Sequence, residues 1–434
     1  MNLLFIENRF KTLFWKAVAK RLKKRIPSLN VSWLIQNKSF SPKDNELSYI
    51  INYPKNDDVL IEDSIFFDEL MAMDRGYYVF GNGAGHYKYY YKKIKEIILL
   101  CKPDFVIGES TLFHELIAIQ VCKELNITYL TPSSCRYPLA KFSFYVNGSL
   151  DVYNYQDKDI KPDHYDLIDE IVNRKVVPDY MKKATGFRKI KIRANIFYNN
   201  YMVLKSWIEG ERFNTPSPFK KILVGIKTKI NRKLWDRRSI DIDNIYNWDN
   251  VVLYPLQMQP ESNIDVWGYP FNDQADNLKR LHQVLPDDKV ILIKPNPKSK
   301  YELNSKLMSL INNLSNVICV SHDTPMDILF NRVNTVYTVT GTIGLEAVLS
   351  GKKLITETNS KLIGYPNVYI LDDEKILLAP TKYNAEHLIS NLDGNSYSGI
   401  ISDPIFSDYC MSEENVNNVA NAFCDVFSKV KKNA

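Results

Sequence analysis

The 434-residue sequence lacks the signatures of several common catalytic and binding sites. Its six cysteines are scattered and include no CxxC pair, which argues against a disulfide framework or a zinc site and for a reducing cytoplasm. No set of Asp and His has the spacing of a catalytic zinc site, and the chain contains neither a Walker phosphate-binding loop nor a GxSxG nucleophile elbow. We therefore expect neither a metal nor a cofactor.

Long apolar runs are also missing. No run approaches the roughly 20 residues of a membrane span. The N-terminal stretch MNLLFIENRFK is not a secretory signal, because its apolar run is too short and the charges follow it. With 45% hydrophobic and 24% charged residues, the composition indicates a soluble globular protein, and the length predicts two or three domains.

Positive charge is concentrated in one segment. Residues 181–238 contain 16 Lys or Arg but only three acids, a local excess of 13 positive charges in a chain whose net charge is +6. Such a basic arm suits an anionic partner, which can be a membrane surface, a nucleic acid or an acidic polysaccharide. We expect a membrane surface or a glycan and no nucleic acid, and we therefore place the protein in the cytoplasm, at the inner face of the cell membrane.

The stretch 334–356 organises the C-terminal half, because its pattern predicts a strand, a tight turn, a helix and a second strand. The turn places Thr340, Gly341 and Thr342 at the start of the helix. Unpaired N–H groups and the helix dipole attract a phosphate there. Glu346 lies one turn further along the same face and is suited to bind a ribose or sugar hydroxyl. The alternative is that Thr342 caps the helix and Glu346 is solvated.

Three other predicted strands in this half also end in polar residues. Gln257 and Gln259 follow the strand 251–256. Lys294 and Asn296 follow the strand 289–293, and Ser321 and His322 follow the strand 317–320. Each of these ends, taken alone, is compatible with an ordinary loop. Because the carboxyl ends of parallel strands share one edge of a sheet, the four ends together predict a ligand site.

The N-terminal half also alternates between predicted strands and helices, with strands predicted at 2–6, 31–36, 77–80, 102–107 and 127–130. Glu109 follows one strand end, where it could act as a general base or orient an acceptor, or else cap the next helix. His114, one turn into that helix, could support Glu109, although a His on a helix face is more often structural. Gly83 lies in a glycine-rich turn that either lets a ligand approach the backbone or is a flexible loop.

Residues 9–26 follow a helical period with many Lys and Arg. They predict either the first crossover helix of an α/β domain or, less favoured, an amphipathic helix on a membrane surface. The predicted domains are an N-terminal α/β domain (1–150), a helical basic arm packed with it (151–249), a second α/β domain (250–405) and a C-terminal helix (406–434). The fold class is therefore α/β, with two Rossmann-like domains facing a cleft and a helical insertion.

Several motifs resemble the capsule polysaccharide biosynthesis family, which includes CMP-sugar transferases for β-Kdo and nonulosonic acids. They are YPLQMQPES (254–262), KPNP (294–297) and TGTIGLEAVLSGKKLI (340–355), with a looser match at GES and HEL within 108–116. The resemblance implies a GT-B glycosyltransferase that moves an acidic sugar from a CMP-sugar to a surface glycan. It makes 1–150 the acceptor domain and 250–405 the nucleotide-sugar domain. The sequence departs from the family pattern at Asn296, where the family usually has His.

The resemblance also implies roles for individual residues. It places Gln259 beside the donor, Lys294 and Asn296 at its phosphate, and the segment Thr340 to Thr342, with Glu346, around the nucleotide. Asn296 cannot supply a proton near neutral pH, so His322 is a candidate to replace the family His. Two other functions stay open, namely a UDP- or dTDP-sugar transferase or epimerase, and a non-catalytic glycan-binding protein of the same fold.

Overall fold

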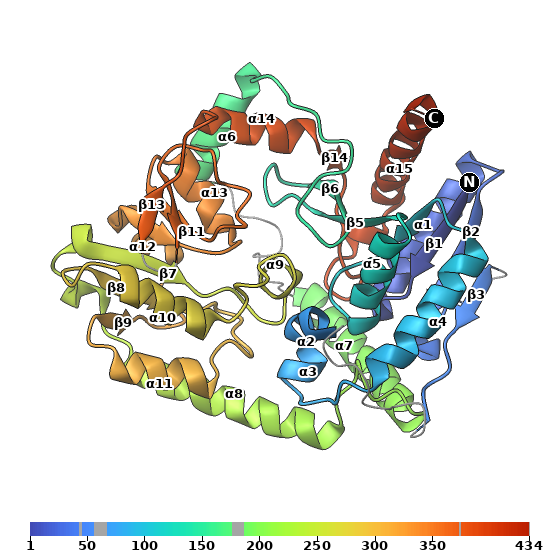
Figure 1. The fold of residues 1–434 in the computed structure, drawn as a ribbon, viewed down its shortest axis with the longest axis horizontal. Coiled ribbons are helices and arrows are strands. Elements are labelled where there is room, and N and C mark those ends of the chain that lie inside the picture. The colour runs from blue at the N-terminus through green and yellow to red at the C-terminus, as the bar shows by residue number, and fades with distance from the viewer. Residues whose placement is uncertain (43–45, 56–66, 176–185, 373–374, 434) are drawn as a thin grey trace. The chain divides into compact units, whose positions relative to one another are not determined.

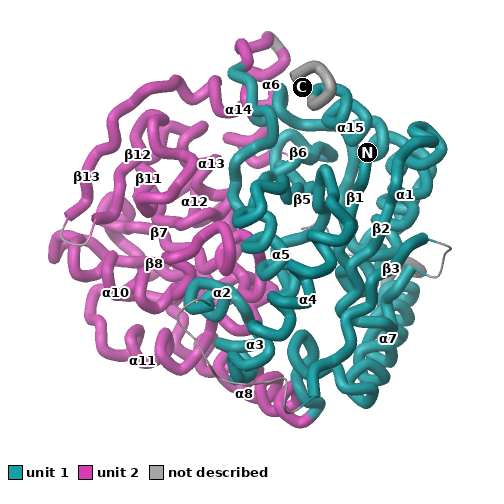
Figure 2. The backbone as a smooth tube through the Cα atoms, turned by 45° about the vertical axis from the view of Figure 1, so that its right-hand side comes forward, with its two compact units in different colours: residues 1–157, 177–218, 392–434 teal, residues 158–176, 219–391 magenta. Residues whose placement is uncertain are grey.

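The structure, a computed structural model, describes residues 1–42, 46–55, 67–175, 186–372 and 375–433 (Figure 1). The chain forms two compact α/β units (Figure 2). Unit 1 contains residues 1–157, 177–218 and 392–434, and unit 2 contains residues 158–176 and 219–391. This division differs from the predicted ranges, because the basic arm is shared between the units and the C-terminal helix belongs to unit 1.

Unit 1 is built on a seven-stranded sheet with the order β14-β6-β5-β4-β1-β2-β3. The strands are β1 (Asn2–Ile6), β2 (Asn30–Ile35), β3 (Leu47–Ile50), β4 (Phe105–Ile107), β5 (Thr128–Ser134), β6 (Lys141–Val146) and β14 (Tyr397–Ser398). The strands from β5 to β3 are parallel, whereas β6 and β14 pair antiparallel to their neighbours. Helices cover both faces of such a parallel sheet, which explains the nearly continuous apolar sequence of β1.

The helices of unit 1 are α1 (Thr12–Arg25), α2 (Asp68–Met73), α3 (Arg75–Tyr78), α4 (His86–Cys101), α5 (Phe113–Glu124), α7 (Gly186–Ile208) and α15 (Glu413–Asn433). The strand predicted at 77–80 is wrong, since α3 ends at Tyr78 and the chain then turns. The Asp74 side chain accepts a hydrogen bond from Gly76 N at 2.9 Å and starts this helix.

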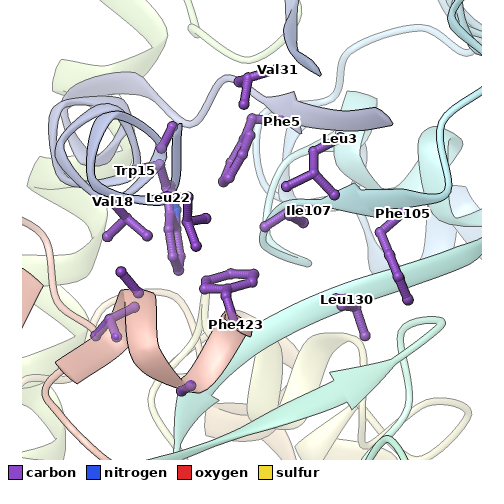
Figure 3. Packing of buried hydrophobic residues seen from close by; sticks show 14 of the residues in the cluster. Leu3, Phe5, Trp15, Val18, Leu22, Val31, Phe105, Ile107, Leu130 and Phe423 are labelled. Carbon is purple, nitrogen blue, oxygen red and sulfur yellow. The ribbon is translucent and has the colours of Figure 1, made fainter. Parts of the chain in front are cut away.

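Aromatic residues from α1 and α15 complete the core of unit 1 (Figure 3). Phe5 of β1 stacks on Trp33 with ring centroids 5.1 Å apart, and it also contacts Trp15 of α1 and Phe423 of α15. The apolar face of α1 is therefore buried against the sheet, so α1 is the crossover helix that the sequence favoured. The same contacts explain why α15 belongs to unit 1.

Unit 2 contains a second seven-stranded sheet, with the order β13-β12-β11-β10-β7-β8-β9. Its strands are β7 (Val251–Pro255), β8 (Val290–Lys294), β9 (Val317–Cys319), β10 (Thr335–Tyr337), β11 (Lys353–Thr356), β12 (Val368–Leu371) and β13 (Ile376–Leu378). All pair in parallel except β13. The two sheets confirm the predicted α/β class with two Rossmann-like domains.

The helices of unit 2 are α6 (Pro162–Val172), α8 (Pro218–Arg238), α9 (Ser262–Asp265), α10 (Gln274–Val284), α11 (Ser305–Asn313), α12 (Met326–Arg332), α13 (Thr342–Leu349) and α14 (Ala385–Gly394). The first residue of α8 and the last three of α14 are assigned to unit 1. In the part of the chain that the structure describes, no helix is long and apolar enough to span a bilayer.

Both sheets reverse their strand order at one point. In unit 1 the reversal lies between β1 and β4, and in unit 2 it lies between β7 and β10. Open α/β sheets bind ligands outside the carboxyl ends of the strands at such a switch point. Each unit therefore has one favoured location for a site.

Candidate functional site

The switch point of unit 2 brings together residues that lie more than 80 positions apart in the sequence. Gln257 follows β7, and its Nε2 donates to Thr340 Oγ1 at 3.0 Å. The backbone N–H of Thr340 in turn donates to Gln257 Oε1 at 3.2 Å. Thr340 Oγ1 also donates to the carbonyl oxygen of Asn263. The structure therefore confirms that these two strand ends meet, and it holds the turn before α13 rigidly from both sides.

The first turn of α13 has the properties that an anion requires. Its N-cap is Gly341, and in the described chain no side chain caps this helix. Glycine is required here, because a Cβ on Gly341 would lie 2.6 Å from Thr338 Oγ1. Thr342 is the first helical residue and is half-buried. The N–H groups of the first helical turn and the helix dipole are therefore directed toward the switch point.

Glu346 lies one turn into α13 and is buried. Its Oε2 accepts a hydrogen bond from Arg174 Nη1 at 2.8 Å, and the same guanidinium lies 3.4 Å from Asp327 Oδ1. Arg174 follows α6, a segment that the sequence assigned to the arm rather than to this unit. The carboxylate of Glu346 thus has a structural partner, and its role as a sugar ligand stays a prediction.

Gln259 is buried in a network of its own. Its Nε2 donates to Asp265 Oδ1 at 2.6 Å, and its Oε1 accepts from Gln274 Nε2 at 3.0 Å. Gln274, the first residue of α10, also donates to the carbonyl oxygen of Gln257 and accepts from the Gln257 N–H. Gln274 therefore ties the loop after β7 to α10, and it was not among the predicted site residues.

Lys294 ends β8 with a buried ammonium group. Its Nζ donates to the carbonyl oxygens of Pro295 at 2.8 Å and His322 at 2.9 Å. Burial lowers the pKa of Lys294 to about 8. The side chain thus joins the β8 end to the β9 end, and its role as a phosphate ligand stays a prediction.

His322 follows β9 and contacts Asp236 of α8. Its Nδ1 lies 2.8 Å from Asp236 Oδ1, so Nδ1 carries the proton and Nε2 has a lone pair. Nε2 is buried and has no hydrogen-bond partner within the described chain. Burial lowers the pKa of His322, and the bond to Asp236 partly opposes this. The ring is therefore neutral near pH 7 and suited to accept a proton rather than to supply one.

The two remaining predicted residues of unit 2 are engaged locally. Asn296 Oδ1 accepts from the Lys298 N–H at 2.9 Å, which forms a turn after β8. Ser321 Oγ accepts from the Asp323 N–H at 3.3 Å. Both residues are half-buried at the sheet edge that carries Lys294 and His322.

The switch point of unit 1 holds Glu109 after β4. Its Oε1 forms an ion pair with Lys11 Nζ at 2.6 Å, and the two side chains are 12% and 15% exposed. Burial raises the pKa of the Glu109 carboxyl, and the charge of Lys11 partly offsets this rise. The strand end passes close to Tyr129, since a Cβ on Gly108 would lie 2.3 Å from Tyr129 Oη. Glu109 is therefore held in place, and the helix that follows is capped by another residue.

That cap is Glu115, which sequence reasoning did not select. Its carboxylate accepts from the N–H groups of Glu109, Thr111 and Leu112 at 2.9–3.2 Å. The Asn8 side chain, after β1, donates to the same carboxylate at 2.8 Å. Glu115 thus ties the β1 end to the β4 end and leaves the Glu109 side chain to pair with Lys11.

His114 does not contact Glu109 in any described hydrogen bond. Its Nδ1 accepts from Asn214 Nδ2 at 3.0 Å, so its Nε2 carries the proton and donates to the carbonyl oxygen of Glu7 at 2.8 Å. Burial lowers the pKa of His114. The neutral ring joins β1, α5 and the 209–217 segment, which gives it a structural explanation. Gly83 also has a structural contact, because its carbonyl oxygen accepts a hydrogen bond from His86 Nδ1 at 2.9 Å.

The described residues contain no group of three or more His, Cys, Asp or Glu side chains able to hold a metal ion. Sequence reasoning missed Lys11, Glu115, Arg174, Asp236 and Gln274. Lys11, Arg174 and Asp236 reach predicted site residues from segments more than 80 residues away, and no local pattern marks them.

The two mostly parallel sheets, each with one switch point, define an α/β protein of two Rossmann-like units. Residues 168–359 match the family of capsule polysaccharide biosynthesis proteins. The match contains the whole β7–α13 region and confirms the predicted resemblance over that segment. No curated protein matches the chain significantly.

The solved structures that align with this chain share little sequence with it and superpose with low TM-scores. A β-Kdo 2,7-transferase, KpsC of Thermosulfurimonas dismutans, is 11% identical with a TM-score of 0.35, and the alignment covers 97% of this chain and 99% of that one. A UDP-GlcNAc 2-epimerase from Methanocaldococcus jannaschii is 13% identical with a TM-score of 0.23, covering 98% and 99%. The corresponding enzyme of Neisseria meningitidis, bound to UDP-GlcNAc, is 12% identical with a TM-score of 0.28, covering 100% of both chains. These values carry no argument about activity.

Proposed function

We propose that the protein is a glycosyltransferase of capsule polysaccharide biosynthesis that transfers an acidic sugar, such as Kdo or a nonulosonic acid, from a CMP-sugar donor to a surface glycan. The observation that carries this proposal is the switch point of unit 2. There, Gln257 and Thr340 hold the uncapped start of α13, inside the segment that matches the family.

The donor phosphate binds at the first turn of α13. CMP leaves with a single phosphate, and the N–H groups of Thr342 and its neighbour, together with the helix dipole, stabilise the charge that develops on it. Lys294 supplies a positive charge at the end of β8, which is separated from β10 by β7. This reaction requires no metal ion in our proposal, because these fixed donors supply the electrostatic stabilisation.

Glu109 of unit 1 acts on the acceptor. In an inverting reaction its carboxylate is the general base for the acceptor hydroxyl, and in a retaining reaction it stabilises or attacks the oxocarbenium-like centre. The acceptor is a glycan or a lipid-linked glycan. The basic arm attracts the protein to the anionic inner face of the cell membrane, where such an acceptor is anchored.

The test is nucleotide release and binding by the purified protein. We expect CMP release from a CMP-sugar in the presence of acceptor, and CMP binding in calorimetric titration. Thr340→Val removes the hydroxyl that holds the α13 turn and should weaken CMP binding by roughly tenfold, the effect of about 1.4 kcal/mol. Thr335→Val, at the start of β10, the strand that leads into this turn, is the matched control and should bind like the wild type.

The outcomes separate the alternatives. Release of UDP or dTDP in place of CMP would identify another nucleotide-sugar enzyme. Binding of glycan without binding of any nucleotide would identify a non-catalytic protein of this fold.

A further inference from the structure

Helix α8 has two faces with unusual roles. One face packs on unit 2, where Trp235 is buried and donates its Nε1 proton to the carbonyl oxygen of Val320 at 2.9 Å. Arg238 of α8 also donates to the carbonyl oxygen of Ile311, in the last turn of α11. Figure 1 shows α8 running next to α11. The face toward the protein is thus anchored largely by polar contacts.

The opposite face of α8 is apolar and exposed. We define the α8 stripe as Phe219, Ile222, Leu223, Ile226, Ile230 and Leu234, all of which are exposed. Their spacing of three, one, three, four and four residues places them in one row along the helix. Phe219 is 70% exposed, so no described part of the chain covers the start of the row. An amphipathic helix of a globular unit normally buries this face.

Helix α7, in unit 1, repeats the arrangement. We define the α7 stripe as Ile190, Phe197, Tyr201, Leu204 and Ile208, again on one helical face and all exposed. The buried side of α7 carries Ser206, whose Oγ donates to Asn37 Oδ1 at 2.9 Å. Two successive helices therefore contact the protein with one face and turn a row of large apolar residues toward solvent on the other. Exposed apolar rows of this size mark interaction surfaces.

The charges beside the stripes indicate the chemistry of the partner. Lys227, Lys229 and Lys233 are exposed along α8, and helix α7 contains no acidic residue. The single acid of α8, Asp236, contacts His322. A second copy of the chain would bring cations against cations. A surface with anionic groups above an apolar layer matches both the stripes and the flanking lysines, and this describes an anionic lipid leaflet.

We propose that the α8 stripe inserts into the headgroup region of an anionic membrane, with the flanking lysines at the phosphate level. The α7 stripe, in the other unit, is a separate surface of the same chemistry. This goes beyond attraction by charge alone, because it names the side chains that enter the lipid. Since salt screens charges but does not weaken apolar burial, binding to the membrane should persist in part at high salt. The inference does not depend on the transfer reaction.

The first test is co-sedimentation of the full-length protein with vesicles of phosphatidylethanolamine and phosphatidylglycerol, without any sugar substrate. At about 1 M salt, where the Debye length is about 3 Å, wild-type binding should fall but remain measurable. The triple variant Phe219→Gln, Ile226→Gln, Ile230→Gln should bind at least about tenfold more weakly under both conditions. The matched control is Leu99→Gln with Leu100→Gln, which removes two exposed leucines from α4 and should bind like the wild type.

The second test reports insertion directly. Phe219→Trp should lose fluorescence in vesicles with brominated acyl chains by more than the wild type does, whereas the control Leu100→Trp should show no additional loss. Equal quenching in the two variants, or equal binding of the triple variant and the wild type, would overturn the proposal. So would a wild-type dimer that the triple variant converts to a monomer, with no vesicle binding, because the stripe would then join two copies. Nucleotide release on a short soluble acceptor should be the same in the triple variant, so this result is independent of the proposed function.

Discussion

Replacing Glu109 by Gln tests whether this carboxylate serves catalysis or only neutralises Lys11. The two groups lie 2.6 Å apart and are mostly, but not fully, buried. Breaking a fully buried ion pair costs about 3–5 kcal/mol and an exposed one about 0–1 kcal/mol. The 12–15% exposure places this pair between those limits. We therefore expect Glu109→Gln to lower the free energy of unfolding by about 2 kcal/mol, measured by urea denaturation.

A double-mutant cycle separates the two roles. Lys11→Met alone should destabilise the protein by a similar amount, because it leaves a buried carboxylate, and the double variant should recover most of the loss. If Glu109 acts on the acceptor, turnover should fall about 10²–10⁴-fold in Glu109→Gln and stay low in the double variant, while CMP affinity is unchanged. A double variant that regains both stability and turnover would refute the catalytic role and leave Glu109 as the partner of Lys11.

Three other residues give sharp predictions. Glu346→Ala should weaken CMP binding by about 1–3 kcal/mol in calorimetric titration, whereas a loss of stability alone, shared by Arg174→Met, would make the pair structural. Burial lowers the pKa of His322, so a catalytic His322 predicts a limb of the pH–rate profile below about 6.5 that disappears in His322→Ala, and identical profiles would exclude it. Burial also lowers the pKa of His86 to about 3 from 6.5 in the unfolded chain, so the unfolded state takes up the proton first and stability falls as the pH drops below 6.5. At pH ~4.5 the loss should be about 2–3 kcal/mol relative to His86→Phe, and parallel pH–stability curves for the two proteins would contradict this assignment.

The fold was predictable where apolar runs follow the period of one kind of element. Strand β1 occupies residues 2–6 as predicted, because its residues are apolar on both faces of a parallel sheet. Residues 77–80 are also aromatic and β-branched, yet Tyr77 and Tyr78 form the end of α3, the helix that Asp74 starts, and the chain turns after them. β3 was missed because its side chains Leu47 and Ile50 are exposed at the sheet edge and show no buried pattern. Local sequence thus specifies the buried strands and leaves edge and irregular segments undetermined.

The site was predictable only as a location. The strand-end rule identified Gln257 and Thr340, and the structure joins their side chains directly. It could not identify Arg174 as the partner of Glu346 or Lys11 as the partner of Glu109, since both cations lie in segments about 100 residues or more away from their partners. Partners of this kind depend on how segments pack, and the periodicity of a single segment carries no such information.

The same limit explains why two basic, amphipathic helices take opposite roles. Helix α1 and helix α8 are both rich in Lys and Arg and both carry an apolar row, so composition alone makes either a candidate for a membrane surface. The row of α1 meets the sheet and α15, and Trp15 and Val18 are buried there. On α8, the face that contacts the protein carries Trp235, which is buried, and Asn231, which donates to the carbonyl oxygen of Leu303. The apolar row therefore turns outward. An apolar face is a candidate for a membrane only when the opposite face of the helix is the one that contacts the protein. Helix α8 meets that condition and helix α1 does not.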